Sequence, residues 1–441
     1  MRFSTIEKNR RFLGGTILLK KLVLLIIFAI GAAGLSSQNA SAATTPPSIY
    51  VDGNLLSLSN KPIVKDGTTL IPVREIAQKL GLKVVFDSSN NIISFKHPYR
   101  STDLTHKIGG NKICTDTFKC QTLQSNSVEI SGVTYVPIRL FEAFDATVFW
   151  DSAKNSIYVY TYELKQLQAV TFANLAYDYA LPIGKDLKDV NFNNMPEVNN
   201  TFKSVQEQLS IYTKDINGNP ITTDKFVKNY ARLGEWELAT YLQPSDFSSS
   251  SEYKQMRSDG FQGYAFRNYK TNEFMIAFRG TEWSLGDITT DTEIAIKRIN
   301  YQKQYAFKLF QKVTTNYNKP TIYLTGHSLG GNLVQATAAN FPKNYKQAYT
   351  FNAAGTNNYS LTTKVVNSRI YTDPVSSIYS HYGRTFVFNI RPYENHPVKE
   401  PLNNASHRLF NFYSYYYLPS TKYWGTNIPY RSGFPNYLWA Y

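Results

Sequence analysis

The sequence has few cysteines, few charged residues and, beyond its N-terminus, no long apolar run. Two cysteines among 441 residues exclude a disulfide-dense scaffold. Charged residues at 18% and hydrophobic residues at 42% exclude a disordered or collagen-like chain. After residue 42 no segment approaches the roughly 18 apolar residues that indicate a spanning helix. At about 150 residues per domain, the length predicts two or three globular domains.

A secretory signal is predicted for residues 1–42. Basic residues precede an apolar run over residues 22–35, which is shorter than the roughly 20 residues of a transmembrane helix. Ala40, Ser41 and Ala42 then provide the small side chains that a signal peptidase requires. We expect a secreted or extracellular protein, associated with the bacterial cell surface in one variant of this hypothesis. The alternative is an uncleaved N-terminal anchor.

The charge balance is strongly basic. Lysine and arginine number 47 against 32 acidic residues, a formal net charge of +15. The chain stays positive when residues 1–42 are removed, which favours anionic partners such as a cell-wall polymer or a membrane surface. We expect no nucleic-acid partner.

Cys114 and Cys120 are predicted to form a small disulfide loop, because export leads into an oxidising compartment. A loop this short contributes about 2 kcal/mol in the chain-entropy model. Two reduced thiols are the alternative, and the spacing is not that of a CxxC metal or redox site.

A repeat follows the signal. Residues 66–74 return as residues 131–139, 65 positions later, and residues 84–87 match residues 148–151 at an offset of 64. Each copy predicts a glycine turn, a short strand, a helix that starts at proline, and two further strands. Gly81 and Asp145 occupy equivalent places at the ends of the two helices.

The paired Pro-x-Arg turns and the Phe-Asp and Trp-Asp strand ends resemble the stalk-like N-terminal domain of copper amine oxidases, over residues 48–160. Similar domains occur as tandem modules on secreted bacterial proteins, so the region is interpreted as a spacer or surface-attachment unit. Copper is not implied, because residues 48–160 contain only two histidines, His97 and His106, which we interpret as loop residues. Arg74 and Arg139 either contact a wall polymer or fix the adjacent turn through a salt bridge.

A second domain is predicted from residue 163 to residue 441. An amphipathic helix opens it, and a polar, Asn-rich loop is expected over residues 191–200. Apolar β runs then alternate with helices over residues 301–317 and 329–341, which predicts an α/β fold with a mostly parallel sheet. The expected strands are residues 263–268, 273–279, 321–325, 347–351, 369–371 and 385–390.

Ser328 is the strongest candidate for a catalytic residue. It lies in a Gly-His-Ser-Leu-Gly-Gly segment between an expected strand and an expected helix. This pattern is typical of a nucleophile elbow, in which Gly326 and Gly330 allow strand and helix to approach. The N–H of Leu329 would then point at a developing oxyanion. His327 is given no role as the base.

An α/β-hydrolase places its acid and then its histidine after the nucleophile. Asp373 is the only aspartate after Ser328, and it ends a β run. His381 follows the acid with no strand between, so it is poorly placed. His396 and His407 both follow the last strand, and the order of residues alone does not separate them.

The motifs Phe-Arg-Gly-Thr (residues 278–281), Gly-His-Ser-Leu-Gly-Gly, Asp-Pro-Val and Ser-His-Arg-Leu resemble class 3 lipases, the fungal-type α/β-hydrolases, over residues 165–415. The resemblance implies that Thr281 and Leu329 form the oxyanion hole, that Asp373 orients the base, and that His407 is that base. The gap between Asp373 and His407 is shorter than in the fungal enzymes. Residues 282–291 contain few apolar groups, so a long apolar lid is not expected.

The sequence therefore predicts a serine ester hydrolase, a lipase or phospholipase, that needs no cofactor and no metal. One alternative is a non-catalytic surface-binding protein with a vestigial hydrolase fold. Another is an esterase acting on acylated polysaccharide. The segment 410–441 is rich in aromatic residues, which could stack on the glycan of such a substrate. Packing of that segment against the hydrolase is the simpler interpretation.

Overall fold

The computed structural model describes residues 45–96, 103–115, 119–178, 183–208, 219–280, 292–358, 360, 362–370, 373–388, 407–409, 412–413 and 438–439. Contacts divide the chain after Pro46, and Pro47–Tyr441 form one compact unit. The predicted signal, residues 1–42, lies outside the described residues. None of the described helices is long and apolar enough to cross a membrane.

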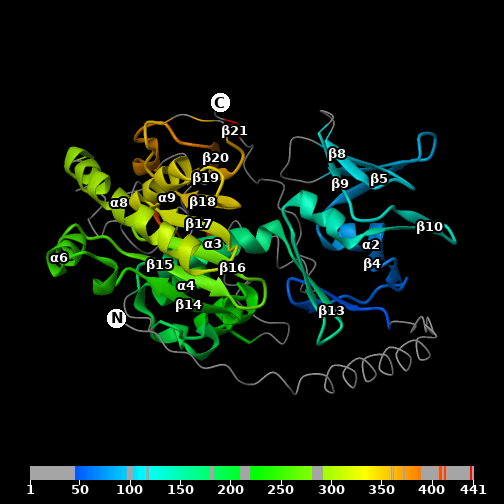
Figure 1. Cartoon of the computed structure of the whole chain (residues 1–441), viewed down its shortest axis with the longest axis horizontal. Coiled ribbons are helices and arrows are strands. Elements are labelled where there is room, and N and C mark those ends of the chain that lie inside the picture. Colours follow the sequence, from blue (N-terminus) through cyan, green and yellow to red (C-terminus); the bar gives the residue numbers. More distant parts are fainter. Residues whose placement is uncertain are drawn as a thin grey trace, which may run out of the picture. The chain divides into compact units, whose positions relative to one another are not determined.

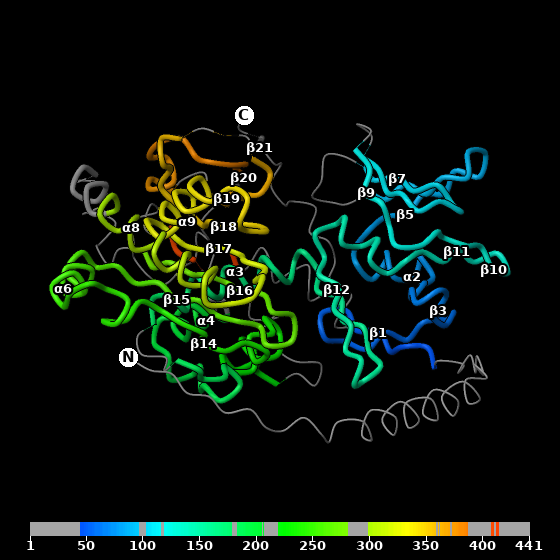
Figure 2. The backbone as a smooth tube through the Cα atoms, in the orientation of Figure 1, coloured from blue at the N-terminus to red at the C-terminus, as the bar shows by residue number. Residues whose placement is uncertain are grey.

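The two copies of the repeat have the same order of elements (Figures 1 and 2). The first copy consists of β3 (Ile63–Lys65), β4 (Thr68–Pro72), α2 (Val73–Lys79), β5 (Lys83–Asp87) and β6 (Ile92–Lys96). The second consists of β10 (Val128–Ile130), β11 (Val133–Pro137), a 3₁₀ helix (Ile138–Phe144), β12 (Thr147–Asp151) and β13 (Ser156–Tyr160). The predicted hairpins and helix are therefore present in both.

The copies pair with each other around an internal two-fold axis. β4 and β11 are antiparallel, and Ile71 lies opposite Val136, its own counterpart in the repeat. The two helices end at left-handed residues, Gly81 with φ 70° and Asp145 with φ 61°. This confirms the predicted equivalence, although aspartate adopts that conformation less readily than glycine.

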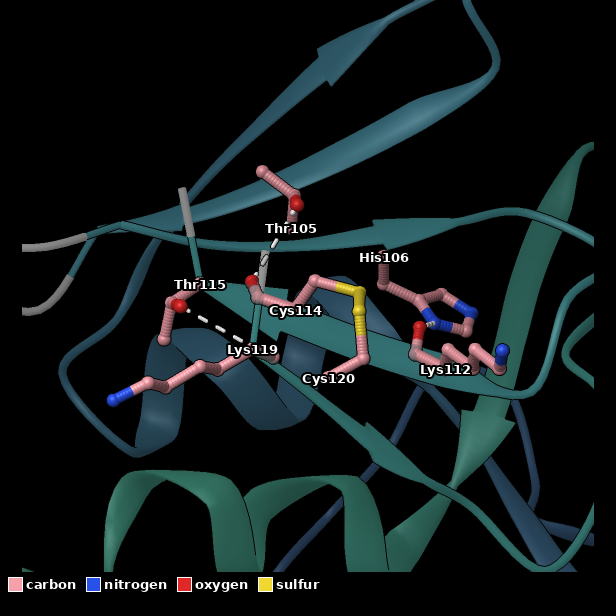
Figure 3. Close-up of a disulfide and its surroundings, with 7 residues drawn as sticks. All are labelled: Thr105, His106, Lys112, Cys114, Thr115, Lys119 and Cys120. Carbon is pink, nitrogen blue, oxygen red and sulfur yellow. Dashed lines mark hydrogen bonds between the residues drawn. A yellow bond between two sulfur atoms is a disulfide. The ribbon is translucent and has the colours of Figure 1, made fainter. Parts of the chain in front are cut away.

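Five further strands complete this module. β1 (Ser48–Val51) pairs with β13 and with β2 (Asn54–Leu55), while β7 (Leu104–Lys107), β8 (Lys112–Thr115) and β9 (Cys120–Thr122) extend the β5–β6 hairpin into a five-stranded sheet. Cys114 lies opposite Cys120 across β8 and β9, and the predicted disulfide is present (Figure 3).

The interpretation of His106 as a loop residue is wrong. It lies on β7, is buried, and both ring nitrogens have partners at 2.7 Å, the Lys112 carbonyl and the Ser127 hydroxyl. A ring held in this way has no nitrogen left for copper. His97 lies outside the described residues.

The two candidate arginines of the repeat have partners within the module. Arg139 pairs with Glu142 one turn along the helix, the salt bridge that was one of its two predicted roles. Arg74 lies over the ring of Phe86, 5.2 Å from the ring centre.

An eight-stranded sheet carries the second domain, in the order β14-β15-β16-β17-β18-β19-β20-β21. The sheet is mixed, which corrects the prediction of a mostly parallel one. The pairs from β16 to β20 are parallel, and the outer pairs are antiparallel. Loop length explains the antiparallel pair of β15 and β16, since the four residues between these strands allow only a hairpin. The strands are β14 (Trp236–Tyr241), β15 (Gly263–Asn268), β16 (Glu273–Phe278), β17 (Thr321–His327), β18 (Gln347–Phe351), β19 (Val365–Ile370), β20 (Arg384–Phe388) and β21 (Leu438–Trp439).

Helices cover both faces of this sheet (Figure 1). α3 (Tyr162–Leu175) and α4 (Pro196–Gln208) belong to the core of one face, with strand residues such as Met275 and Tyr323. α8 (Thr292–Asn316) and α9 (Leu329–Asn340) belong to the other core, with the alternate residues Ile276 and Leu324. Two shorter helices are α5 (Thr223–Lys225) and α6 (Ser250–Ser258).

Two helix predictions need correction. α3 is buried from Leu164 to Leu175 and is therefore not amphipathic. Two of its polar side chains have distant partners, since Lys165 donates to Glu273 and Asn174 accepts from Thr201. The predicted Asn-rich loop is largely helical, since α4 begins at Pro196. The two carboxylate oxygens of Asp178 accept the first N–H groups of α4, from Glu197 and Val198, each at 3.0 Å, and so cap the helix.

Candidate active site

Ser328 occupies a strained turn between β17 and α9. Its φ of 56° and ψ of −130° are rare for a residue with a side chain. A Cβ on Gly326 would lie 2.5 Å from the Gly330 carbonyl oxygen, and a Cβ on Gly330 would lie 2.2 Å from that of Phe278. Glycine is therefore required on both sides of the serine. The structure places Ser328 as the nucleophile-elbow pattern predicts.

Asp373 and His407 meet at this turn. The Nε2 atom of His407 lies 2.9 Å from Ser328 Oγ, and its Nδ1 atom lies 2.7 Å from Asp373 Oδ1. All three residues are buried. The carboxylate can only accept, so Nδ1 carries the proton of this bond, and Nε2 is the ring nitrogen that faces the serine hydroxyl.

The environment of Asp373 keeps it ionised. Burial alone would raise the pKa of this carboxyl group, but the hydrogen bond and charge of His407, together with hydrogen bonds from Ser376, lower it below its ordinary value. The Ser376 N–H donates to Oδ2 at 2.8 Å, so each carboxylate oxygen has a partner of its own. The aspartate is thus fixed in the orientation that holds His407.

One of the two expected oxyanion-hole donors is described. Leu329 is the first residue of α9, where a backbone N–H has no partner within the helix. Thr281 lies outside the described residues. Gly280, the residue before it, is described, and a Cβ on Gly280 would lie 3.0 Å from the Cβ of Ser328. The chain therefore passes beside the nucleophile immediately before Thr281.

Two residues near the base were missed by the sequence analysis. His327 donates from Nε2 to the backbone carbonyl of His407 at 2.7 Å, and its Nδ1 accepts from the Tyr177 hydroxyl at 2.9 Å. Burial, and then the nearby His407, lower the pKa of His327 to about 3, so its ring is neutral. Tyr177 lies 150 residues before His327, and no local pattern connects them.

The remaining histidines are placed differently. The Nε2 atom of His381 lies 2.9 Å from the Ser376 carbonyl oxygen. His381 therefore binds the turn that follows Asp373 and has no role as the base. His396 lies outside the described residues. Among the described residues, no group of three or more His, Cys, Asp or Glu side chains could hold a metal ion.

A strained serine after a β-strand, connected through histidine to aspartate, defines the arrangement of α/β-hydrolases. Two family models match the chain, the copper amine oxidase N-terminal domain over residues 50–159 and the Tle-like phospholipase domain over residues 214–382. Residues 50–159 are thus similar to the first family, and residues 214–382 are similar to the second, a family of phospholipase-like domains. The match includes Ser328 and Asp373 and ends before His407.

Fungal lipases are among the solved structures to which the chain shows a distant likeness. Lip2 lipase from Yarrowia lipolytica is 15% identical, with 47% of this chain and 84% of that one covered and a TM-score of 0.29. A triacylglycerol lipase from Penicillium expansum is 14% identical, with 35% and 70% covered and a TM-score of 0.25. Lipase II from Rhizopus niveus is 13% identical, with 58% and 86% covered and a TM-score of 0.29. Likenesses this distant do not by themselves assign an activity. A search of curated proteins finds no match.

Proposed function

We propose that the protein is a secreted serine hydrolase that cleaves the acyl esters of phospholipids through an acyl-enzyme on Ser328. The hydrogen-bonded series from Asp373 through His407 to Ser328 carries this proposal. A vestigial hydrolase would have no need to keep three buried polar side chains in this register. The Tle-like phospholipase match supports the phospholipid over other esters.

Acylation begins when Ser328 Oγ attacks the ester carbonyl carbon. His407 Nε2 takes the hydroxyl proton, and the new imidazolium is stabilised by the Asp373 carboxylate. The carbonyl oxygen becomes an oxyanion, which accepts from the N–H of Leu329 and, in this proposal, of Thr281. The tetrahedral intermediate then expels the lysophospholipid alcohol, which receives the proton from Nε2.

Deacylation repeats the steps with water. His407 removes a proton from water, the hydroxide attacks the acyl carbon, and Ser328 leaves with the proton as the fatty acid is released. No cofactor enters the balance of either step.

The basic net charge of +15 supports a negatively charged lipid surface or wall polymer as the place where the protein works. Removal of residues 1–42 on export would leave a chain that starts at Ala43, and N-terminal sequencing of the exported protein tests this.

The activity is tested with the chain from Ala43 to Tyr441 and its Ser328→Ala variant. Vesicles of phosphatidylglycerol and phosphatidylcholine, triacylglycerol emulsion and acetylated xylan are offered as substrates, and released acid is measured. We expect fatty acid from the vesicles with the parent chain and none with the variant. Acetate release alone would favour the polysaccharide esterase, and equal rates for both proteins would overturn the assignment of the nucleophile.

A further inference from the structure

A single residue joins the repeat module, residues 48–160, to the hydrolase helix that follows. β13 ends at Tyr160 and α3 begins at Tyr162, so only Thr161 lies between them. The backbone N–H and the hydroxyl of Thr161 donate to the two carboxylate oxygens of Asp52, at 2.8 and 2.7 Å, and its Oγ accepts the Leu164 N–H at 3.1 Å. Because this junction is buried and hydrogen-bonded, it is more rigid than a flexible linker.

A buried ion pair follows one turn later. Lys165 Nζ lies 2.6 Å from Glu273 Oε2, and both side chains are at most 3% exposed. Thr147, on β12 of the repeat module, donates to the other carboxylate oxygen at 3.0 Å. Burial alone would raise the pKa of Glu273, but the charge and hydrogen bond of Lys165 and the hydroxyls around it lower it, so the carboxylate is ionised. Because both charges are buried, removal of either partner would leave the other charge uncompensated.

A third contact involves the last strand of the module. The Tyr160 hydroxyl donates to Glu235 at 2.9 Å, and Glu235 also pairs with Arg232 and, at 3.0 Å, with Lys270. Lys270 Nζ in turn lies 5.4 Å from the ring centre of Tyr158. These side chains come from β13 on one side and from the segments around β14 to β16 on the other.

We propose that these contacts lock the repeat module to the hydrolase sheet, so that residues 47–441 move and unfold as one body and the module is not a detachable spacer. The lock lies at the beginning of the parallel strands, since Glu273 opens β16 and pairs with Thr321, the first residue of β17. Ser328 directly follows the end of β17. At about 3.3 Å per residue, roughly 20 Å of strand separate the lock from the nucleophile, and the locking residues supply no group to the reaction.

Hydrogen exchange during urea unfolding tests the lock, with the amides of β4 and β11 reporting on the module and those of β16 and β17 on the hydrolase. The chain from Ala43 to Tyr441 is compared with Ile93→Val in the module core and Thr147→Val at the lock. Lys188→Met is the control, because the Lys188 side chain is 56% exposed. This readout is independent of activity, so its failure would leave the proposed function untouched.

We expect one urea midpoint for both sets of amides in the parent chain. Ile93→Val and Thr147→Val should each move the two midpoints down together by equal amounts, and Lys188→Met should move neither. Separate midpoints in the parent chain would overturn the lock. So would a shift confined to the part that carries the substitution.

Discussion

Replacement of Asp373 by asparagine should change the tautomer of His407 while leaving its ring in the same position. The Ser376 N–H donates to Oδ2 at 2.8 Å, so the asparagine must turn its carbonyl oxygen toward Ser376 to keep this bond. Its NH₂ group then faces His407 Nδ1, which must accept. The ring proton moves to Nε2 and points at Ser328 Oγ, where the base needs a lone pair.

The expected loss in kcat is about 10⁴-fold, the size associated with a triad held in the wrong tautomer. At 1.36 kcal/mol per factor of ten this corresponds to about 5.5 kcal/mol of transition-state stabilisation. KM should change little, because Asp373 is buried beneath the base and contacts no substrate in the proposed mechanism.

The assay is the initial rate on p-nitrophenyl esters from butyrate to palmitate, with folding checked by circular dichroism. Asp246→Asn is the matched control, because Asp246 pairs with Lys312 outside the site, and it should retain the parent rate. A loss below tenfold in a folded Asp373→Asn variant would refute the reasoning about the tautomer.

Three further predictions concern stability. Gly330→Ala puts a Cβ 2.2 Å from the Phe278 carbonyl oxygen and should lower the free energy of unfolding in urea by about 1–3 kcal/mol, as overpacking does; an unchanged midpoint would contradict this. His327 is neutral when folded, with its pKa lowered to about 3, so the unfolded chain binds the extra proton and stability should fall as pH decreases from about 6.5 toward 3. His327→Asn should weaken this slope in thermal melts, and an identical slope would count against it. Reduction of Cys114–Cys120 should cost about 2 kcal/mol, measured as a lower melting temperature in dithiothreitol, with a Cys114→Ala, Cys120→Ala chain insensitive to the reductant.

The sequence predicted those parts of the fold that local patterns determine. The strands β15, β16 and β18 occur where apolar β runs were expected, because a strand buried on both faces is apolar throughout. The offset of 65 residues between the two copies of the repeat was also visible in the sequence. In the structure, Ile71 pairs with its counterpart Val136.

Features that depend on distant partners were not predictable. α4 forms in an Asn-rich segment because Asp178, well before it in the chain, caps its first turn. α3 is buried on all sides although it carries Lys165, which pairs with Glu273 more than 100 residues later. The sequence indicated Ser328 through its elbow and Asp373 through its place after a strand, whereas the contact of His327 with Tyr177 left no local signal.

The most direct test of the central claim is labelling with a fluorophosphonate, followed by mass mapping of the modified peptide. The chain from Ala43 to Tyr441 should take up one equivalent of the probe, attached to Ser328 Oγ, and the Ser328→Ala variant should take up none. An unlabelled parent chain that is folded and intact, or a probe found on a different residue, would contradict the account of Ser328, His407 and Asp373 as a catalytic triad.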